Sequence, residues 1–134
     1  MRVHLCRHAE AVAGEPGEPD ELRELTGAGR HGAKLLADRL ASLDEPPRNV
    51  VTSPLTRAVQ TAEPVAGLLG CEVLVRGELA PGATVDSLRT AVEGLEGPVA
   101  AVCHQPDCSG IVLALTGHDP GFQVGDSFAL ELDS

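Results

Sequence analysis

The sequence predicts an α/β domain in which helices cover both faces of a mostly parallel sheet. Short apolar segments that favour strands alternate with longer segments whose apolar residues recur at helical spacing. The length of 134 residues fits one domain able to bury a core of its own, and no internal repeat or linker divides it. We therefore expect a single domain over residues 1–134, with three layers (α/β/α) and about five or six strands.

The first quarter of the chain is expected to hold a strand, a loop and a helix. Residues 3–6 are mostly apolar and lead to Arg7 and His8, so a buried strand would carry two polar residues at its carboxyl end. Residues 13–20, rich in Gly, Pro and Glu, are expected to form a loop. A helix is expected to start from an N-cap at Thr26 and to end before two prolines. Its apolar positions are Ala28, Leu35, Leu36, Leu40 and Leu43.

The second quarter repeats the strand and the helix. Residues 49–52 form a second apolar run, and Ser53 with Pro54 is expected to open the next helix, as an N-cap hydroxyl and a first-turn proline. This helix is expected to stop at Gly70, with Pro64 bending it or marking an early break.

The second half supplies the remaining strands and helices. We expect strands at residues 72–75 and 98–103, with a short helix at 85–95 between them. A further helix is expected to start at residues 105–106. A closing edge strand is expected near residues 128–132, where apolar and polar side chains partly alternate.

Composition excludes several classes of function. A formal charge of −10 argues against general binding to nucleic acids or anionic membranes, and two Phe with no Trp or Tyr leave no aromatic platform for bases. No apolar run approaches the ~20 residues of a membrane span, and the start lacks the apolar stretch of a signal peptide. We expect a cytoplasmic protein whose four cysteines are buried free thiols.

Polar residues that suit phosphate chemistry follow the expected strands. Arg7 and His8 end the first strand, His104 follows the fourth, and Arg57 lies near the start of the helix after the second. The carboxyl ends of parallel strands meet at one edge, so these groups could converge. Guanidinium groups match phosphoryl oxygens, and a neutral imidazole, kept neutral by nearby positive charge, can attack phosphorus. With no P-loop, nucleotide fingerprint or Asp-rich magnesium cluster, we expect neither metal nor nucleotide cofactor.

The same residues carry a resemblance to the histidine phosphatase (phosphoglycerate mutase-like) superfamily. Residues 7–10, RHAE, resemble its Arg-His-Gly signature. Three later blocks follow in the family's order: LTGAG at 25–29, SPLTRAVQTA at 53–62 and HQP at 104–106. The resemblance covers nearly the whole chain and implies the phosphoglycerate mutase-like fold and a metal-independent phosphatase.

The resemblance also implies roles for particular residues. His8 would accept the phosphoryl group, while a backbone carbonyl holds its other ring nitrogen and fixes the tautomer able to attack. Arg7 and Arg57 would clamp the phosphoryl oxygens, and His104 would donate a hydrogen bond to them. Ala9 stands where many members have glycine, a departure that the small phosphohistidine phosphatases share.

Larger members of the family supply a glutamate as general acid for the leaving group. Glu78, just past the third expected strand, is the best-placed candidate, with Glu10 and Asp86 as alternatives; a solvated loop carboxylate is an equal interpretation of Glu78. A leaving imidazole has a pKa of roughly 6.5, so a phosphohistidine substrate would need only a weak acid.

The chain has little beyond the family core, whereas mutases and large acid phosphatases carry segments that close over a small substrate. An open site favours a phosphoprotein, and the resemblance is strongest to SixA-type phosphatases, which act on histidine-containing phosphotransfer proteins. A small-molecule phosphomonoesterase and a catalytically silent phosphate-binding or phosphoprotein-binding module are the alternatives. A zinc site is a further alternative, which does not depend on the family resemblance. Its ligands would come from His4, Cys6, His8, Cys103, His104 and Cys108. No familiar zinc-binding spacing occurs in the sequence, which argues against it.

Overall fold

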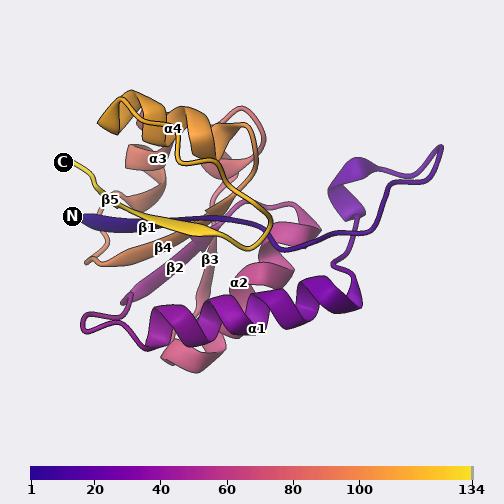
Figure 1. Ribbon diagram of the computed structural model, residues 1–134, viewed down its shortest axis with the longest axis horizontal. Coiled ribbons are helices and arrows are strands. Elements are labelled where there is room, and N and C mark those ends of the chain that lie inside the picture. The colour runs from indigo at the N-terminus through magenta and orange to yellow at the C-terminus, as the bar shows by residue number, and fades with distance from the viewer. Residues whose placement is uncertain (134) are drawn as a thin grey trace.

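The computed structural model describes residues 1–133 and is built on a five-stranded sheet with the order β3-β2-β4-β1-β5 (Figure 1). The strands are β1 (Arg2–Arg7), β2 (Asn49–Thr52), β3 (Val73–Val75), β4 (Val99–Cys103) and β5 (Ser127–Glu131). The first four are parallel, and β5 runs antiparallel along β1 at the edge. The expected mixed, mostly parallel sheet is confirmed.

Two pairs of helices cover the two faces of this sheet (Figure 1). Helices α1 (Gly27–Ala41) and α2 (Thr56–Leu69) pack on one face with the core residues that it presents. Helices α3 (Val85–Val92) and α4 (Asp107–Thr116) pack on the other. None of the helices in residues 1–133 combines the length and apolar character needed to cross a bilayer.

The buried face of α1 differs in part from the expected one. Ala28, Leu35 and Leu43 are exposed, although their spacing suggested the core. The side that is buried carries Gly29, Ala33, Leu36, Ala37 and Leu40. Three of these five residues are Gly or Ala, and such small side chains let α1 approach α2 closely, so packing between helices overrode the larger apolar residues.

Helix α2 begins later than expected and continues past its proline. Thr56 is its first residue, so Ser53 is not the N-cap but lies in the turn before it, where its Oγ accepts a hydrogen bond from the Leu55 N–H at 3.3 Å. Pro64 lies inside a helix that runs on to Leu69 and ends at left-handed Gly70. Burial of α2 residues on both sides of this proline, against the sheet, holds the helix together.

Helix α3 is shorter than expected because the chain leaves helical geometry at Glu93 and adopts a positive φ of 78° at Gly94. Its start is stabilised by a capping box, in which Thr84 Oγ1 accepts from the Ser87 N–H and the Ser87 side chain accepts from the Thr84 N–H.

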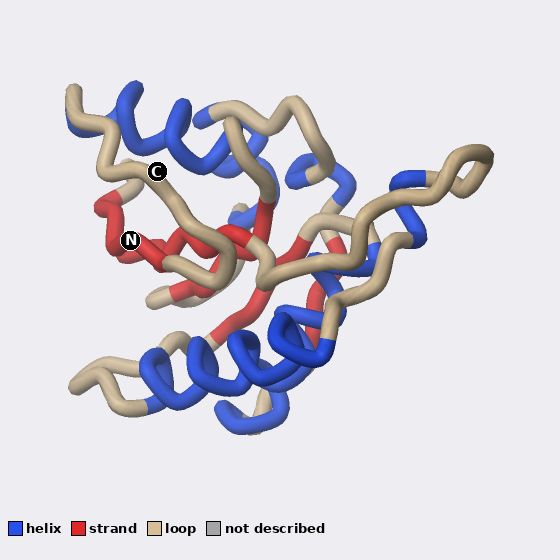
Figure 2. The backbone as a smooth tube through the Cα atoms, turned by 45° about the vertical axis from the view of Figure 1, so that its right-hand side comes forward, coloured by secondary structure: helices blue, strands red, loops and turns tan. Residues whose placement is uncertain are grey.

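Residues 10–25 form an arm that projects from the body of the molecule (Figure 2). Its two sides meet at a bridge between Ala11 and Leu25, with the Val12 N–H donating to Glu24 O at 2.8 Å. A 3-10 turn, η1 (Asp20–Leu22), interrupts the returning side. The arm leads into the Thr26 N-cap of α1, whose Oγ1 accepts from the Gly29 N–H at 2.9 Å.

Gly29 is required because α1 starts directly against the backbone of the arm. A Cβ at this position would lie 1.9 Å from the carbonyl oxygen of Glu10, a backbone atom that accepts a hydrogen bond from the Thr26 N–H at 3.0 Å. The glycine of the LTGAG block is therefore a packing requirement that brings the arm and α1 together.

We expect Gly29→Ala to lower the free energy of unfolding by about 1–3 kcal/mol, because the added methyl group displaces the backbone at Glu10. Gly32→Ala is the matched control in the same helix, since its Cβ would make ordinary contact with the Ala9 side chain at 3.9 Å. The control should be neutral or stabilising by up to about 1 kcal/mol. Urea denaturation of both variants makes the comparison, and equal effects would contradict the packing argument.

Candidate active site

A cavity of about 370 Å³ lies at the carboxyl ends of the parallel strands. The residues predicted to converge all line it, from the end of β1, the first turn of α2 and the residue after β4. These are Arg7, His8, Arg57 and His104. The rest of the lining consists of Glu10, Ala11, Arg23, Pro81, Gln105 and Val124.

The His8 ring is fixed by the backbone beside it. Its Nδ1 lies 2.7 Å from the carbonyl oxygen of Ala9, and since a carbonyl only accepts, Nδ1 carries the proton and donates. The Ala9 N–H in turn donates to Thr61 Oγ1 at 3.0 Å, which anchors this turn to α2. The carbonyl contact implied by the family resemblance is thus present, with alanine in place of glycine, and it leaves Nε2 as the unprotonated nitrogen.

The environment of His8 keeps its imidazole neutral. Burial lowers the pKa of His8, and the positive charges of Arg57, Arg7 and Arg23 lower it further, against an opposing effect of the Ala9 hydrogen bond. The residue as a whole is only 9% exposed. A neutral, buried imidazole with one free lone pair is a nucleophile that persists to a lower pH than a solvated histidine would.

Both predicted arginines are held at one end and unpaired at the other. Arg7 donates from a terminal nitrogen to Phe122 O at 2.9 Å, and Arg57 donates from its two terminal nitrogens to Asp20. Within residues 1–133, the buried Nε of each has no hydrogen-bond partner. Because buried donors are normally paired, two partnerless Nε–H groups on arginines that both line one cavity favour an anion site.

His104 lies beside His8 at the cavity, with ring centroids 5.3 Å apart and planes inclined by 56°. Its Nε2 lies 2.7 Å from Ser53 Oγ, while its buried Nδ1 has no partner among the described residues. Burial lowers the pKa of His104 to about 4, helped by the cost of placing a second positive charge beside His8 if that ring is protonated and by the Arg57 guanidinium. The second imidazole is therefore also neutral at pH 7, and an anion would complete its hydrogen bonding.

The structure adds residues that sequence reasoning missed. Arg23 lines the cavity from the arm, with its Nε 2.8 Å from Asp20 Oδ1. Gln60 Oε1 accepts from the Leu25 N–H at 2.8 Å, which fastens α2 to the base of that arm. The Thr61 hydroxyl donates to Arg57 O at 2.8 Å while it accepts from the turn at His8. Gln60 and Thr61 both belong to the SPLTRAVQTA block, and this was the signal in the sequence that could have identified them. From that block, only Arg57 was predicted as a site residue.

The three candidate general acids occupy different places. Glu10 lines the cavity, whereas Glu78 lies exposed in the 3-10 turn η2 (Gly77–Leu79), outside the lining. Leu79 inserts into the core at this turn, and Glu78 beside it is left on the solvent side. Asp86 is on α3, in an exposed ion pair with Arg89 at 3.1 Å, also outside the cavity. Of the three, the structure brings only Glu10 to the predicted histidines.

The alternative zinc ligands are not gathered at one point. Cys6 packs in the core on the α1–α2 face, while Cys103 and Cys108 lie in the core of the opposite face, with their Sγ atoms 3.0 Å apart. Across residues 1–133, no group of three or more His, Cys, Asp or Glu side chains is arranged to hold a metal ion.

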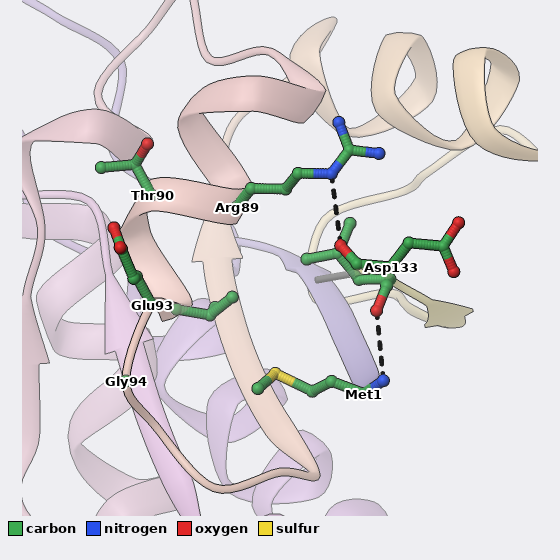
Figure 3. A pocket seen from close by; sticks show the side chains of 8 residues that line it. Met1, Arg89, Thr90, Glu93, Gly94 and Asp133 are labelled. Carbon is green, nitrogen blue, oxygen red and sulfur yellow. Dashed lines mark hydrogen bonds between the residues drawn. The ribbon is translucent and has the colours of Figure 1, made fainter.

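A second cavity of about 390 Å³ lies between the end of α3 and the two ends of the chain (Figure 3). Its basic groups are already engaged by the main chain: Arg89 Nε donates to Asp133 O at 3.3 Å, and the Met1 amine donates to Leu132 O at 3.1 Å. The lining contains no histidine or cysteine. We therefore take the His8 cavity as the candidate active site.

Comparison with known proteins shows which family the chain resembles. The family model of the histidine phosphatase superfamily (branch 1) matches residues 3–81. An uncharacterized protein of Picosynechococcus is 35% identical over 127 residues, which cover 88% of this chain and 77% of the relative. A protein from Agrobacterium tumefaciens, assigned as the phosphohistidine phosphatase SixA, superposes with a TM-score of 0.84 at 28% identity, over 97% of this chain and 90% of that one. The protein histidine phosphatase SixA complexed with tungstate gives 0.79 at 26% identity, over 98% and 95%.

We expect the free energy of unfolding to fall as the pH is lowered from about 6.5 to about 4, by up to about 3 kcal/mol from His104. In this interval the unfolded chain protonates His104 and the folded chain does not, so stability is complete above the unfolded pKa and is lost below it. His104→Gln should flatten the profile, whereas His31→Gln, on the exposed surface of α1, should not. Urea denaturation across this pH range tests this, and an unchanged slope in His104→Gln would contradict it.

Proposed function

The chain belongs to the histidine phosphatase superfamily, which confirms the resemblance in its sequence, and we propose that it is a phosphatase acting through a phosphohistidine formed on His8. We further propose that its substrate is phosphohistidine on another protein. The observation that carries the proposal is that His8, whose Nδ1 is held by the Ala9 carbonyl, lines one cavity with Arg7, Arg57 and His104. Each of the last three has a buried nitrogen without a partner in the described part of the chain.

In the first step, Nε2 of His8 attacks phosphorus in line while the bond from phosphorus to the leaving group breaks. The Nε–H groups of Arg7 and Arg57 and the ring of His104 hold the oxygens that do not react, so the charge spread over them is stabilised by groups already in place. The Ala9 carbonyl stabilises the imidazole as it becomes positively charged. Water then attacks phosphorus, the bond to Nε2 breaks, and phosphate leaves.

The leaving group also needs a proton. Glu10 is the carboxylate that lines the cavity, and it is exposed to solvent. An alkoxide leaving group is strongly basic and needs a positioned general acid. An imidazole leaving group, with a pKa of roughly 6.5, takes up a proton near neutrality without strong assistance. This difference supports phosphohistidine over a phosphate ester as the substrate.

The shape of the site supports a protein substrate. The cavity is lined by residues of the arm and of loops at the strand ends, and residues 1–133 add no further domain to the sheet and its helices. The arm itself projects away from the body of the molecule (Figures 1 and 2). The SixA relative is a protein histidine phosphatase, and its tungstate is an oxyanion of the tetrahedral kind that this cavity would take as phosphate. The partner we propose is therefore a phosphorylated protein, such as a histidine-containing phosphotransfer protein. In the proposed mechanism, His8 attacks phosphorus and Arg7, Arg57 and His104 hold its oxygens, so no step calls for a metal ion. We place this activity in the cytoplasm, where the four cysteines would stay free thiols.

Brief reaction of the wild type with 32P-labelled substrate should leave label that is stable to base and labile to acid, as expected of a phosphohistidine. His8→Ala should take up none, because the attacking nitrogen is gone. His31→Ala, a histidine exposed on α1, is the control and should label like the wild type. Equal labelling of His8→Ala would refute the covalent intermediate.

The rate on a phosphohistidine protein should exceed the rates on a phosphoserine peptide and on p-nitrophenyl phosphate. Glu10→Gln should lower the phosphohistidine rate by less than about threefold, since that leaving group needs only a weak acid. Comparable rates on all substrates would identify a general phosphomonoesterase, and phosphate binding without any hydrolysis would identify a silent binding module.

A further inference from the structure

We propose that Asp20 is a positioning residue for Arg57, which with Arg7 forms the proposed phosphate clamp. The carboxylate and the main-chain carbonyl of Asp20 hold the terminal nitrogens of Arg57, so that the Nε edge of the guanidinium is presented to the phosphoryl group. This inference rests on the proposed function and assigns a role to an arm residue that touches neither His8 nor the reacting phosphorus.

The contacts of Arg57 divide its donors into two sets. One terminal nitrogen donates to Asp20 O at 3.0 Å and the other to Asp20 Oδ2 at 3.2 Å, so Asp20 takes the end of the guanidinium. The Nε–H lies on a different edge of the planar group, and it is buried without a partner in the described part of the chain. A guanidinium held at its end has one remaining edge that can pair with two phosphoryl oxygens.

Burial explains why Arg57 needs such a partner. The residue is only 5% exposed, and a desolvated guanidinium without a counter-charge is costly when no phosphate is bound. The side chain of Asp20 is 60% exposed, so the carboxylate covers the buried cation from the solvent side. Asp20 can therefore neutralise and orient Arg57 without occupying the cavity, whose lining does not include it.

The same carboxylate also sets the place of a second guanidinium. Its other oxygen, Oδ1, accepts from Arg23 Nε at 2.8 Å, so Asp20 bridges two arginines that both line the cavity. The hydrogen bond from Arg23 and the charge of Arg57 lower the pKa of Asp20. The carboxyl group thus stays ionised at neutral pH, which suits it to holding cations and not to donating a proton to a leaving group.

Calorimetric titration with inorganic phosphate tests this inference independently of turnover. Asp20→Ala should weaken phosphate binding by about three- to tenfold, a range that corresponds to the loss of a partly exposed ion pair to a buried partner, and Asp20→Asn should weaken it less. Glu21→Gln is the matched control: it removes a negative charge from the same turn, and among the described residues Glu21 makes no hydrogen bond or ion pair. With a phosphohistidine substrate, KM should rise in Asp20→Ala. Its thermal unfolding midpoint should fall as well, because the buried Arg57 guanidinium loses its counter-charge, so phosphate binding is compared at a temperature at which every variant is folded.

Two results would overturn the inference while the proposed function stands. Tighter phosphate binding by Asp20→Ala would mean that the carboxylate competes with phosphate for the arginines. In an Arg57→Lys background, we expect Asp20→Asn to change phosphate affinity by less than about twofold, because two changes that act through the same contact should not be additive. If Asp20→Asn weakened phosphate binding there as much as it does in the wild type, Asp20 would not act through Arg57. A wild type that binds no phosphate and hydrolyses none of the substrates would instead overturn the proposed function, and this inference with it.

Discussion

The hydrogen bond from His8 Nδ1 to the Ala9 carbonyl is the contact on which the rest of the site depends. A neutral imidazole has one lone pair, and this contact decides that it is on Nε2. The contact is intrinsic to two adjacent residues, but its geometry is supported from outside, because the Ala9 N–H is tied to Thr61 on α2. In the mechanism we propose, the attacking nitrogen is therefore set before any substrate arrives, and Arg7, Arg57 and His104 would hold the phosphoryl oxygens.

The candidate site concentrates positively charged side chains in a molecule whose net charge is strongly negative. The chain carries a formal charge of −10, yet Arg7, Arg23 and Arg57 gather at one cavity. The buried Nε–H groups of Arg7 and Arg57 have no partner among residues 1–133. The protein contains this cost by pairing the distal ends, through Phe122 O for Arg7 and through Asp20 for Arg57. Both histidines respond with lowered pKa values and stay neutral, so the site adds no further positive charge until an anion is bound.

Helix α2 is the scaffold that joins these parts. It carries Arg57, and through Gln60 and Thr61 it holds both the base of the arm and the turn after β1. Gly29 then allows α1 to start directly against Glu10, so the arm is anchored on two sides. In this arrangement, the position of Asp20 over Arg57 depends on how the whole arm packs against α1 and α2. A change at the base of the arm would therefore also move the partner of Arg57, one of the two arginines of the proposed phosphate clamp.

The sequence by itself determined the order of strands and helices, the family, and the four residues that meet at the strand ends. These are local patterns: a short apolar run specifies a buried strand, and parallel strands place the residues that follow them at one edge. Tertiary structure alone decided which face of α1 is buried, that Pro64 stays inside α2, and that Glu78 lies outside the cavity while Glu10 lines it. It also brought Asp20 and Arg57, 37 residues apart, into contact. Such outcomes depend on how closely two elements pack and on where a loop returns, and neither the spacing nor the polarity of the residues encodes those distances.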